Sequence, residues 1–268
     1  MSSQPLSAYT VDSLAVEIYP DKLALGQAAA DFVAGHIRTA ITERGHSRVI
    51  FATGASQYDF LASLIAQPDI DWPRVTAFHL DEYVGITADH PASFRRYLQE
   101  RLFSRLPFAA VRLPFAAVHL LTGDAPDPAA ECRRYAALLA AAPIDIACVG
   151  IGENGHLAFN DPPADFTTRA AVHIVELDEA CRRQQVGEGH FPSLAAVPPQ
   201  ALSMTVPAIL AAQVISCVVP DARKAEAVSC TLQGPIDPTC PASAMRSHPH
   251  CRLYLDRASA GLLKDKPQ

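Results

Sequence analysis

Residues 144–161 read Ile144-Asp145-Ile146-Ala147-Cys148-Val149-Gly150-Ile151-Gly152-Glu153-Asn154-Gly155-His156-Leu157-Ala158-Phe159-Asn160-Asp161. The run up to Val149 is almost entirely apolar, which is typical of a buried strand, and the glycines after it end the strand. An amide, an imidazole, a second amide and a carboxylate then follow within eight positions, at Asn154, His156, Asn160 and Asp161. Because these groups can hold or move a proton, the stretch predicts a chemically active loop at a strand end.

Strand-to-helix units flank this stretch on both sides. Apolar runs predict strands at 14–18, 48–52, 75–80, 119–121, 144–149, 213–219 and 252–255, and helical spacing predicts helices at 23–42, 58–66, 91–103, 128–142, 221–232 and 258–263. The alternation predicts an α/β protein, a Rossmann-like three-layer α/β/α fold with a mostly parallel sheet. The 268 residues suit a single domain, 1–268, in which we expect the polar residues 1–10 to be frayed.

One segment repeats itself. The heptapeptide Arg105-Leu-Pro-Phe-Ala-Ala-Val111 recurs unchanged at 112–118. Solenoid repeats have longer periods and several copies, so we interpret the repeat as a tandem duplication within a connection. We expect it to form a longer loop.

Composition excludes several classes of protein. The net charge of −6 argues against a nucleic-acid partner, and the absence of 18 consecutive apolar residues argues against a membrane span. Residues 1–10 lack the basic region and apolar core of an export signal. Seven cysteines without a C-x-x-C pair suit a reducing cytoplasm. No second histidine or cysteine lies at ligand spacing from His156, so no metal is expected.

The glycines of the opening stretch also match G-x-G-x-x-G, the signal of a dinucleotide-binding turn. That signal requires a helix to begin at the third glycine, Gly155. Pro162 and Pro163 follow within about two turns, and no helix cap stands between. We therefore expect no nicotinamide or flavin cofactor.

Polar residues end three of the predicted strands. In parallel sheets ligands bind beyond the carboxyl ends of the strands, so Ser56, Asp81 and His156 are expected to converge. One carboxylate of the pair Asp81-Glu82 can act as a base in a pocket shared with His156. The plain alternatives are a solvated acid pair at the strand end and a core histidine with both nitrogens satisfied.

Anion-binding residues are expected near the first of these strand ends. The turn Thr53-Gly54-Ala55-Ser56 offers hydroxyls and open N–H groups at a helix start, which suit a phosphate. Positive charge can come from Lys224, Arg182 or Arg183, each of which has an ordinary surface residue as its alternative interpretation.

Two stretches together resemble a known family. Asp81-Glu82-Tyr83-Val84-Gly85, followed by His90-Pro91-Ala92-Ser93-Phe94, and the stretch from Gly150 to Pro162 are similar to the signatures of glucosamine-6-phosphate deaminases. The likeness continues at Lys224-Ala225 and covers nearly the whole chain. The related 6-phosphogluconolactonases share the fold and a G-x-G-x-x-G-H stretch, but the Asp-Glu-Tyr triplet and Phe159-Asn160 are similar to the deaminase branch.

The resemblance implies an activity and roles for residues. It implies aldose–ketose isomerisation and deamination of glucosamine 6-phosphate, without a cofactor. Asp81 would move a proton between C2 and C1, and His156, oriented by Asn154 and Asp161, would assist ring opening. The residues that would bind the substrate and its phosphate are Thr53, Gly54, Ala55, Ser56, Gly155, Lys224, Arg182, Arg183 and Gln185.

The chain departs from the family pattern at several of these positions. Many members have Asp where Asn154 stands and Glu where Asp161 stands, and the family's phosphate-binding arginine aligns with Gln185. Arg182 or Arg183 is therefore expected to replace that arginine. A lactone hydrolase and a catalytically inactive sugar-phosphate sensor remain alternatives, and since some members are hexamers, a homo-oligomer is also open.

Overall fold

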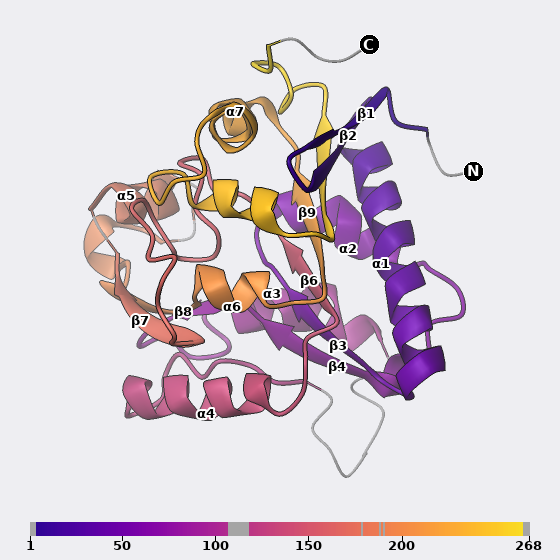
Figure 1. The fold of residues 1–268 in the computed structure, drawn as a ribbon. Helices are drawn as coiled ribbons and strands as arrows, with labels where there is room; N and C mark the ends of the chain where they lie inside the picture. The colour runs from indigo at the N-terminus through magenta and orange to yellow at the C-terminus, as the bar shows by residue number, and fades with distance from the viewer. Residues whose placement is uncertain (1–3, 107–117, 178, 188, 190, 265–268) are drawn as a thin grey trace.

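A computed structural model describes residues 4–106, 118–177, 179–187, 189 and 191–264. Its central sheet has seven strands: β1 (Ser7–Val11), β2 (Leu14–Tyr19), β3 (Ser47–Phe51), β4 (Val75–His79), β6 (Ile146–Val149), β9 (Val214–Val219) and β10 (Cys251–Asp256). Their order is β1-β2-β10-β9-β6-β3-β4, and every pair is parallel except β1 with β2. The predicted mostly parallel sheet is confirmed (Figure 1).

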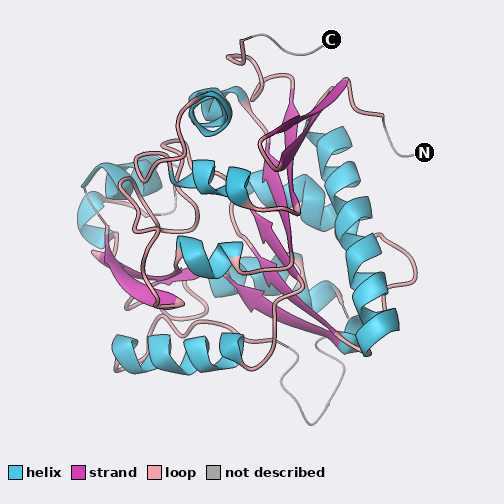
Figure 2. Cartoon of the chain, in the orientation of Figure 1, coloured by secondary structure: helices cyan, strands magenta, loops and turns pink. Residues whose placement is uncertain are grey.

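Helices cover both faces of this sheet, as the alternation of the strands requires (Figure 2). One face packs against α1 (Lys22–Arg44), α2 (Tyr58–Ile65) and α3 (Phe94–Arg101), and the other against α4 (Pro128–Ala140), α6 (Val206–Leu210) and α7 (Ala225–Gln233). In β9, Cys217 and Val219 point to the face covered by α4, α6 and α7. Val218 points to the face covered by α1, α2 and α3. Strands buried on both faces explain the continuous apolar runs of the sequence.

A second, antiparallel sheet lies beside the first and was not predicted. It consists of β5 (Asp81–Tyr83), β8 (Gln200–Met204) and β7 (Val172–Glu176), in that order. The helix α5 (Glu179–Gly187) follows β7 in the chain and lies near this sheet (Figure 1). In the register of β5 and β8, Asp81 stands opposite Ser203. A strand of three residues is too short to give a periodic pattern, so only pairing reveals β5.

Short 3-10 helices begin two of the α-helices at the carboxyl ends of strands. The 3-10 helix η1 (Ala55–Gln57) leads from β3 into α2, and η6 (Ala222–Lys224) leads from β9 into α7. Both stand at the same edge of the parallel sheet, because parallel strands end on one side.

Four local expectations are wrong. Residues 7–10 are not frayed, since Ser7–Val11 pairs with β2 along its whole length. Helix α3 begins at Phe94, after the cap Ser93, so Pro91 lies outside it. Residues 258–263 form turns instead of a helix, and 119–121 form no strand beyond the isolated bridge that Val118 makes with Ala77. The greater part of the duplication, 107–117, lies outside the described residues.

The predicted helix over 23–42 is confirmed almost to the residue. Asp21 caps its N-terminus through a 2.9 Å bond from the Ala24 N–H, and Gly45 ends it in the left-handed conformation. Among the helices that the structure describes, none has both the length and the apolar character needed to span a membrane.

Candidate active site

A cavity of about 400 Å³ opens beyond the carboxyl ends of β3, β4 and β6. The predicted site residues on its lining are Thr53, Gly54, Ala55, Ser56, Asp81, His156, Gln185 and Lys224. The three strand ends that were expected to converge therefore contribute to one cavity. Asn154, Gly155 and Asp161 are not among the described residues that line it, and they surround His156 from outside.

Asp81 presents a buried carboxyl group to this cavity. It begins β5, directly after the turn that follows β4, and it is 7% exposed. Burial, reinforced by the neighbouring charge of Glu82, raises the pKa of Asp81 to about 8. A carboxyl group with a pKa near neutrality can both take up and release a proton at physiological pH, which is what a catalytic base requires.

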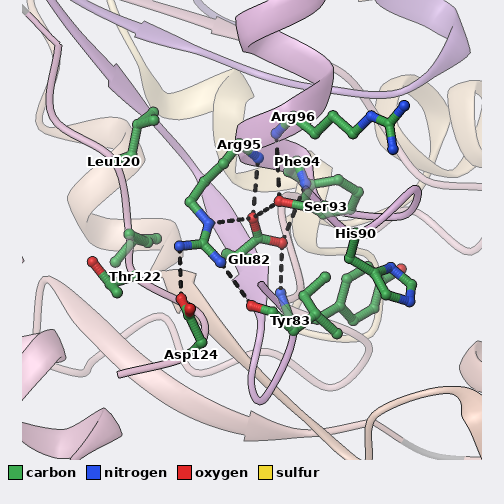
Figure 3. A network of polar contacts seen from close by, with 12 residues as sticks. Glu82, Tyr83, His90, Ser93, Phe94, Arg95, Arg96, Leu120, Thr122 and Asp124 are labelled. Carbon is green, nitrogen blue, oxygen red and sulfur yellow. Dashed lines mark hydrogen bonds and ion pairs between the residues drawn. The ribbon is translucent and has the colours of Figure 1, made fainter. Parts of the chain in front are cut away.

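Glu82, the neighbour of Asp81 in the chain, lies at the centre of a network of polar contacts (Figure 3). It is fully buried, and its two oxygens accept hydrogen bonds from the Tyr83, Phe94 and Arg95 N–H groups, the Ser93 hydroxyl and the Arg95 guanidinium, at 2.7 to 3.2 Å. Arg95 also donates to Asp124 and to the Ile86 carbonyl. Glu82 is thus held as a satisfied carboxylate that ties β5 to the start of α3.

Ser93 and Glu82 also explain where α3 starts. The first turn of a helix has N–H groups without intrahelical partners, and Glu82 accepts from those of Phe94 and Arg95. The Ser93 hydroxyl donates to the same carboxylate at 2.7 Å. The two acids therefore have different roles: Glu82 fixes the backbone at the start of α3, and Asp81 faces the cavity.

His156 is presented by the loop that follows β6. The Gly152 N–H donates to the His156 carbonyl at 2.9 Å, and a Cβ atom at residue 152 would come within 2.2 Å of the imidazole ring. Gly155 adopts a φ of 88°, a conformation that glycine reaches without strain. The glycines thus serve to fold the loop under the histidine ring.

Asn154 and Asp161 support the histidine from behind. Asn154 accepts from the His156 N–H at 3.1 Å and donates to Asp161 at 2.9 Å. His156 Nδ1 and Asp161 Oδ1 lie 3.1 Å apart, close enough for a hydrogen bond but not aligned for one. The predicted grouping of these three side chains is therefore present.

Asn160 anchors the same loop to the second sheet. Its amide nitrogen donates to the Leu157 carbonyl at 2.6 Å and to the Met204 carbonyl of β8 at 2.8 Å, and its oxygen lies 3.1 Å from Nε2 of His173. All of these contacts are internal to the protein, so Asn160 holds the loop instead of facing the cavity.

The turn after β3 forms the opposite wall. Gly54 adopts φ 96° and ψ 167°, a region that in practice only glycine occupies, and this bends the chain into η1. The Tyr97 hydroxyl, from α3, donates to the Gly54 carbonyl at 2.8 Å. Tyr97 also stacks on Tyr58, with ring centroids 5.8 Å apart. Tyr97, which also lines the cavity, therefore holds the turn in place.

Of the cations expected at the site, Lys224 lines the cavity and the two arginines do not. Neither Arg182 nor Arg183 is among the described residues on the cavity lining: Arg182 donates to the Leu194 and Val197 carbonyls, and Arg183 pairs with Glu179. Both lie on α5, and these contacts engage their guanidinium groups away from the cavity lining. The expectation that one of them replaces the family's arginine is not supported, and the cations on the described lining are Lys224 and Arg223.

Gln185 itself does line the cavity, and its side-chain oxygen accepts from the Tyr83 hydroxyl at 2.7 Å.

The glycines at 150–155 do not open a helix, since no helix is described between β6 and β7. That finding agrees with the rejection of a dinucleotide site. Within the described part of the chain, no group of three or more His, Cys, Asp or Glu side chains is placed to hold a metal ion.

Comparison with known proteins identifies the family. A sequence model described as glucosamine-6-phosphate isomerases/6-phosphogluconolactonase matches residues 20–253. The chain belongs to this family. A glucosamine-6-phosphate deaminase from Listeria innocua serovar 6a is 37% identical over 227 residues, which are 85% of this chain and 92% of the relative. A glucosamine-6-phosphate deaminase from Streptococcus pneumoniae (strain Hungary19A-6) is 36% identical over 213 residues, 80% of this chain and 86% of the relative.

Solved structures of the glucosamine-6-phosphate isomerase/6-phosphogluconolactonase family agree with the fold. One, described as a monomeric glucosamine-6-phosphate deaminase, superposes with a TM-score of 0.82 at 32% identity and covers 92% of this chain and 99% of its own. A 6-phosphogluconolactonase from Thermotoga maritima has a TM-score of 0.72 at 18% identity, covering 91% of this chain and 99% of its own, and shows a likeness of fold alone. The family resemblance and the three-layer architecture are confirmed.

Three lining residues of this family member escaped the sequence analysis. Gln57 donates to the Val149 carbonyl at 3.4 Å and so joins the turn after β3 to the end of β6. Arg223 directly precedes the predicted Lys224 in the sequence, and this adjacency is the signal that could have identified it as a lining residue. Tyr97 gave no signal, because an aromatic residue at helical spacing predicts core packing.

Proposed function

We propose that the protein converts glucosamine 6-phosphate and water into fructose 6-phosphate and ammonia. One observation carries this: Asp81 and His156, the two proton-transfer groups that the reaction needs, line the same cavity although 75 positions separate them in the chain. The deaminase relatives, 37% and 36% identical, support the same substrate.

The phosphate is assigned to the wall formed by the turn at Gly54–Ser56 and by Lys224. N–H groups at the start of η1, and the Ser56 hydroxyl, suit phosphate oxygens. Lys224 is 9% exposed on the cavity lining and supplies a positive charge. Binding the phosphate at this wall directs the sugar toward Asp81 and His156.

Ring opening is the first chemical step. The anomeric O1–H bond and the C1–O5 bond break, the C1 carbonyl forms, and the ring oxygen gains a proton. His156 is the group on the cavity lining that can relay this proton, because an imidazole both accepts and donates near neutral pH. Asn154 and Asp161 hold its loop and ring in place.

Isomerisation follows on the open chain. The Asp81 carboxylate removes the C2 proton and returns a proton to C1, while O1 gains a proton and the C2 nitrogen loses one. The product is a C2 imine with the same atoms as the open-chain amino aldehyde. One water then adds to C2, and ammonia leaves to give the ketone. Two positioned proton-transfer groups suffice for this sequence.

The environment of Asp81 fits the role of a base whose protonation state changes during turnover. Its pKa of about 8 is set first by burial and then by Glu82. The substrate carries a cationic ammonium at C2, and a cation next to the carboxyl favours the ionised base. Substrate binding therefore activates Asp81.

The test is direct. Purified protein is incubated with glucosamine 6-phosphate, and ammonia and fructose 6-phosphate are measured in coupled assays. We expect equal amounts of both, a loss of about 10³-fold or more in kcat for Asp81→Asn, and wild-type rates for the exposed variant Asp71→Asn. Full activity in Asp81→Asn would refute the proposed base.

6-Phosphogluconolactone is the comparison substrate. Hydrolysis of a lactone needs no base at C2, so that reaction leaves the buried Asp81 carboxyl without a role. We expect no lactonase turnover. Lactone hydrolysis without ammonia release, or tight sugar-phosphate binding without any turnover, would favour the corresponding alternative.

The cellular setting is part of the proposal. We place the enzyme in the cytoplasm, in amino-sugar catabolism. Each of the cysteines that the structure describes with its side chain is a free thiol, which supports a reducing compartment. The solved deaminase with a TM-score of 0.82 is described as monomeric, so light scattering of this 28.7 kDa chain is the measurement that decides between a monomer and a homo-oligomer.

A further inference from the structure

Two consecutive cations stand at one wall of the cavity. Arg223 and Lys224 both belong to η6, at the carboxyl end of β9, and both line the cavity. They differ in exposure: Lys224 is 9% exposed, whereas 46% of the Arg223 side chain is exposed. Lys224 is therefore a fixed charge, and Arg223 is a cation that has room to move.

Arg223 is only loosely engaged by carboxylates. Its Nη1 lies 3.6 Å from Glu153 Oε1, and its Nη2 lies 3.9 Å from Asp221 Oδ2. Both distances exceed the 2.7 to 2.9 Å that is typical of a charge-assisted hydrogen bond. Exposed ion pairs of this kind contribute little free energy. The guanidinium can thus leave Glu153 for a stronger anion.

Other arginines around the site are committed to internal partners. Arg182 donates to two backbone carbonyls at 2.8 and 3.0 Å. Arg95 is 7% exposed and bound to Glu82 and Asp124. Arg101 lies over the Tyr58 ring, with its central carbon 3.8 Å from the ring centroid. Moving any of these arginines would break contacts inside the protein. Moving Arg223 instead gives up the two long ion pairs with Glu153 and Asp221.

We propose that Arg223 is the specificity-determining cation for the phosphate of the sugar substrate, and that the phosphate displaces Glu153 from it. A guanidinium offers two parallel N–H groups that match two phosphate oxygens, and Lys224 adds a point charge. Gln185, at the cavity lining, is neutral and adds none. This inference rests on the proposed function for the identity of the sugar. The binding of a phosphate group by Arg223 does not depend on that function.

The exchange also connects phosphate binding to the histidine loop. Glu153 stands between Gly152, which packs under the His156 ring, and Asn154, which accepts from the His156 N–H. When Arg223 turns to the phosphate, Glu153 is released and the loop loses its tie to η6. Phosphate binding therefore changes the contacts of the loop that carries His156, the residue assigned to ring opening.

The first experiment measures phosphate affinity without turnover. Calorimetric titration with inorganic phosphate is carried out on the wild type and on Arg223→Ala, Arg223→Lys, Glu153→Gln and Arg74→Ala. Arg74 is the matched control, because it is an exposed arginine in an ion pair, with Asp71 at 2.9 Å, at the opposite end of β4 from the cavity. We expect at least tenfold weaker binding for Arg223→Ala, partial recovery for Arg223→Lys, two- to fivefold tighter binding for Glu153→Gln, and no change for Arg74→Ala.

The second experiment uses glucosamine 6-phosphate. For Arg223→Ala we expect KM to rise at least tenfold while kcat stays within threefold. Phosphate affinity of Arg223→Ala within twofold of the wild type, or a wild type that binds no phosphate, overturns the proposal. If Glu153→Gln binds phosphate no more tightly than the wild type, the proposed displacement of Glu153 by the phosphate is refuted. A protein that shows the expected phosphate affinities but releases no ammonia refutes the proposed function alone.

Discussion

The imidazole of His156 occupies the space that a side chain at Gly152 would fill: a Cβ atom there would lie 2.2 Å from Cε1 of the ring. The Gly152 N–H also donates to the His156 carbonyl at 2.9 Å. The glycine therefore fixes both the backbone and the ring of the histidine. In this chain the glycine-rich signal serves a histidine instead of a dinucleotide.

This relationship makes Gly152→Ala a sharp test. The added methyl group forces the His156 ring to move away, so we expect kcat to fall by about 10²-fold or more. Gly35→Ala is the matched control, since a Cβ at Gly35, within α1, meets no atom within 4 Å. That variant should keep full activity and gain about 0.5 to 1 kcal/mol of stability. An active Gly152→Ala enzyme would contradict the role given to the ring position.

The pH dependence of the reaction should report Asp81. Because burial and Glu82 raise its pKa to about 8, the carboxylate that acts as the base is lost as pH falls below that value. We expect kcat/KM to rise with pH, about tenfold per unit at low pH, and to level off above about 8. Initial rates between pH 6 and 9.5 measure the profile. A profile that is flat across this range argues against Asp81 as the base.

Glu82 should influence the same profile through its charge. In Glu82→Gln the neighbouring charge that raises the pKa of Asp81 is removed, so the midpoint of the kcat/KM profile should move to lower pH. The variant should also be less stable, by about 2 to 4 kcal/mol, because the buried Arg95 loses one of its two carboxylate partners. Glu100→Gln, which alters the exposed pair with Arg96, should change stability by less than about 0.5 kcal/mol. Denaturant titrations give both values.

Asp81 should also make stability depend on pH. Its pKa is higher in the folded protein than the ordinary value, so the folded state binds this proton more tightly. Its contribution to stability is full below about pH 4 and is lost as pH rises to about 8. Asp81→Asn removes the buried charge and should raise the free energy of unfolding at pH 9 by about 1 to 3 kcal/mol relative to the wild type. At pH 5 we expect a smaller difference, and equal effects at both pH values would contradict the assignment.

Tyr97 should act on substrate binding. Its hydroxyl donates to the Gly54 carbonyl at 2.8 Å and so holds the turn assigned to the phosphate. For Tyr97→Phe we expect KM to rise about threefold to tenfold, with kcat changed by less than twofold, since one hydrogen bond is lost. Tyr19→Phe removes a comparable hydroxyl, which donates to Glu17 at 2.7 Å on β2, and should leave KM unchanged. A fall in kcat alone would place Tyr97 elsewhere in the reaction.

The sequence by itself determined the layered fold and the convergence of Asp81 and His156 on one cavity. Apolar runs, helical spacing and caps such as Asp21 and Gly45 are local properties, because a residue's backbone preference and periodicity act within a few positions. Polar residues after β3, β4 and β6 had to share one edge of a parallel sheet. Asp81 and His156 were therefore identified from the printed residues.

Tertiary structure alone decided which residues serve those two. The three-residue β5 exists only through its pairing with β8, and Ser7–Val11 joins the sheet by pairing with β2. The sequence does not show that Glu82 is saturated by α3 while Asp81 is left to the cavity. Nor does it show that Arg223 lines that cavity while Arg182 binds backbone carbonyls. Each of these depends on hydrogen bonds, burial or charge shared between distant segments, and such contacts exist only once the chain has folded.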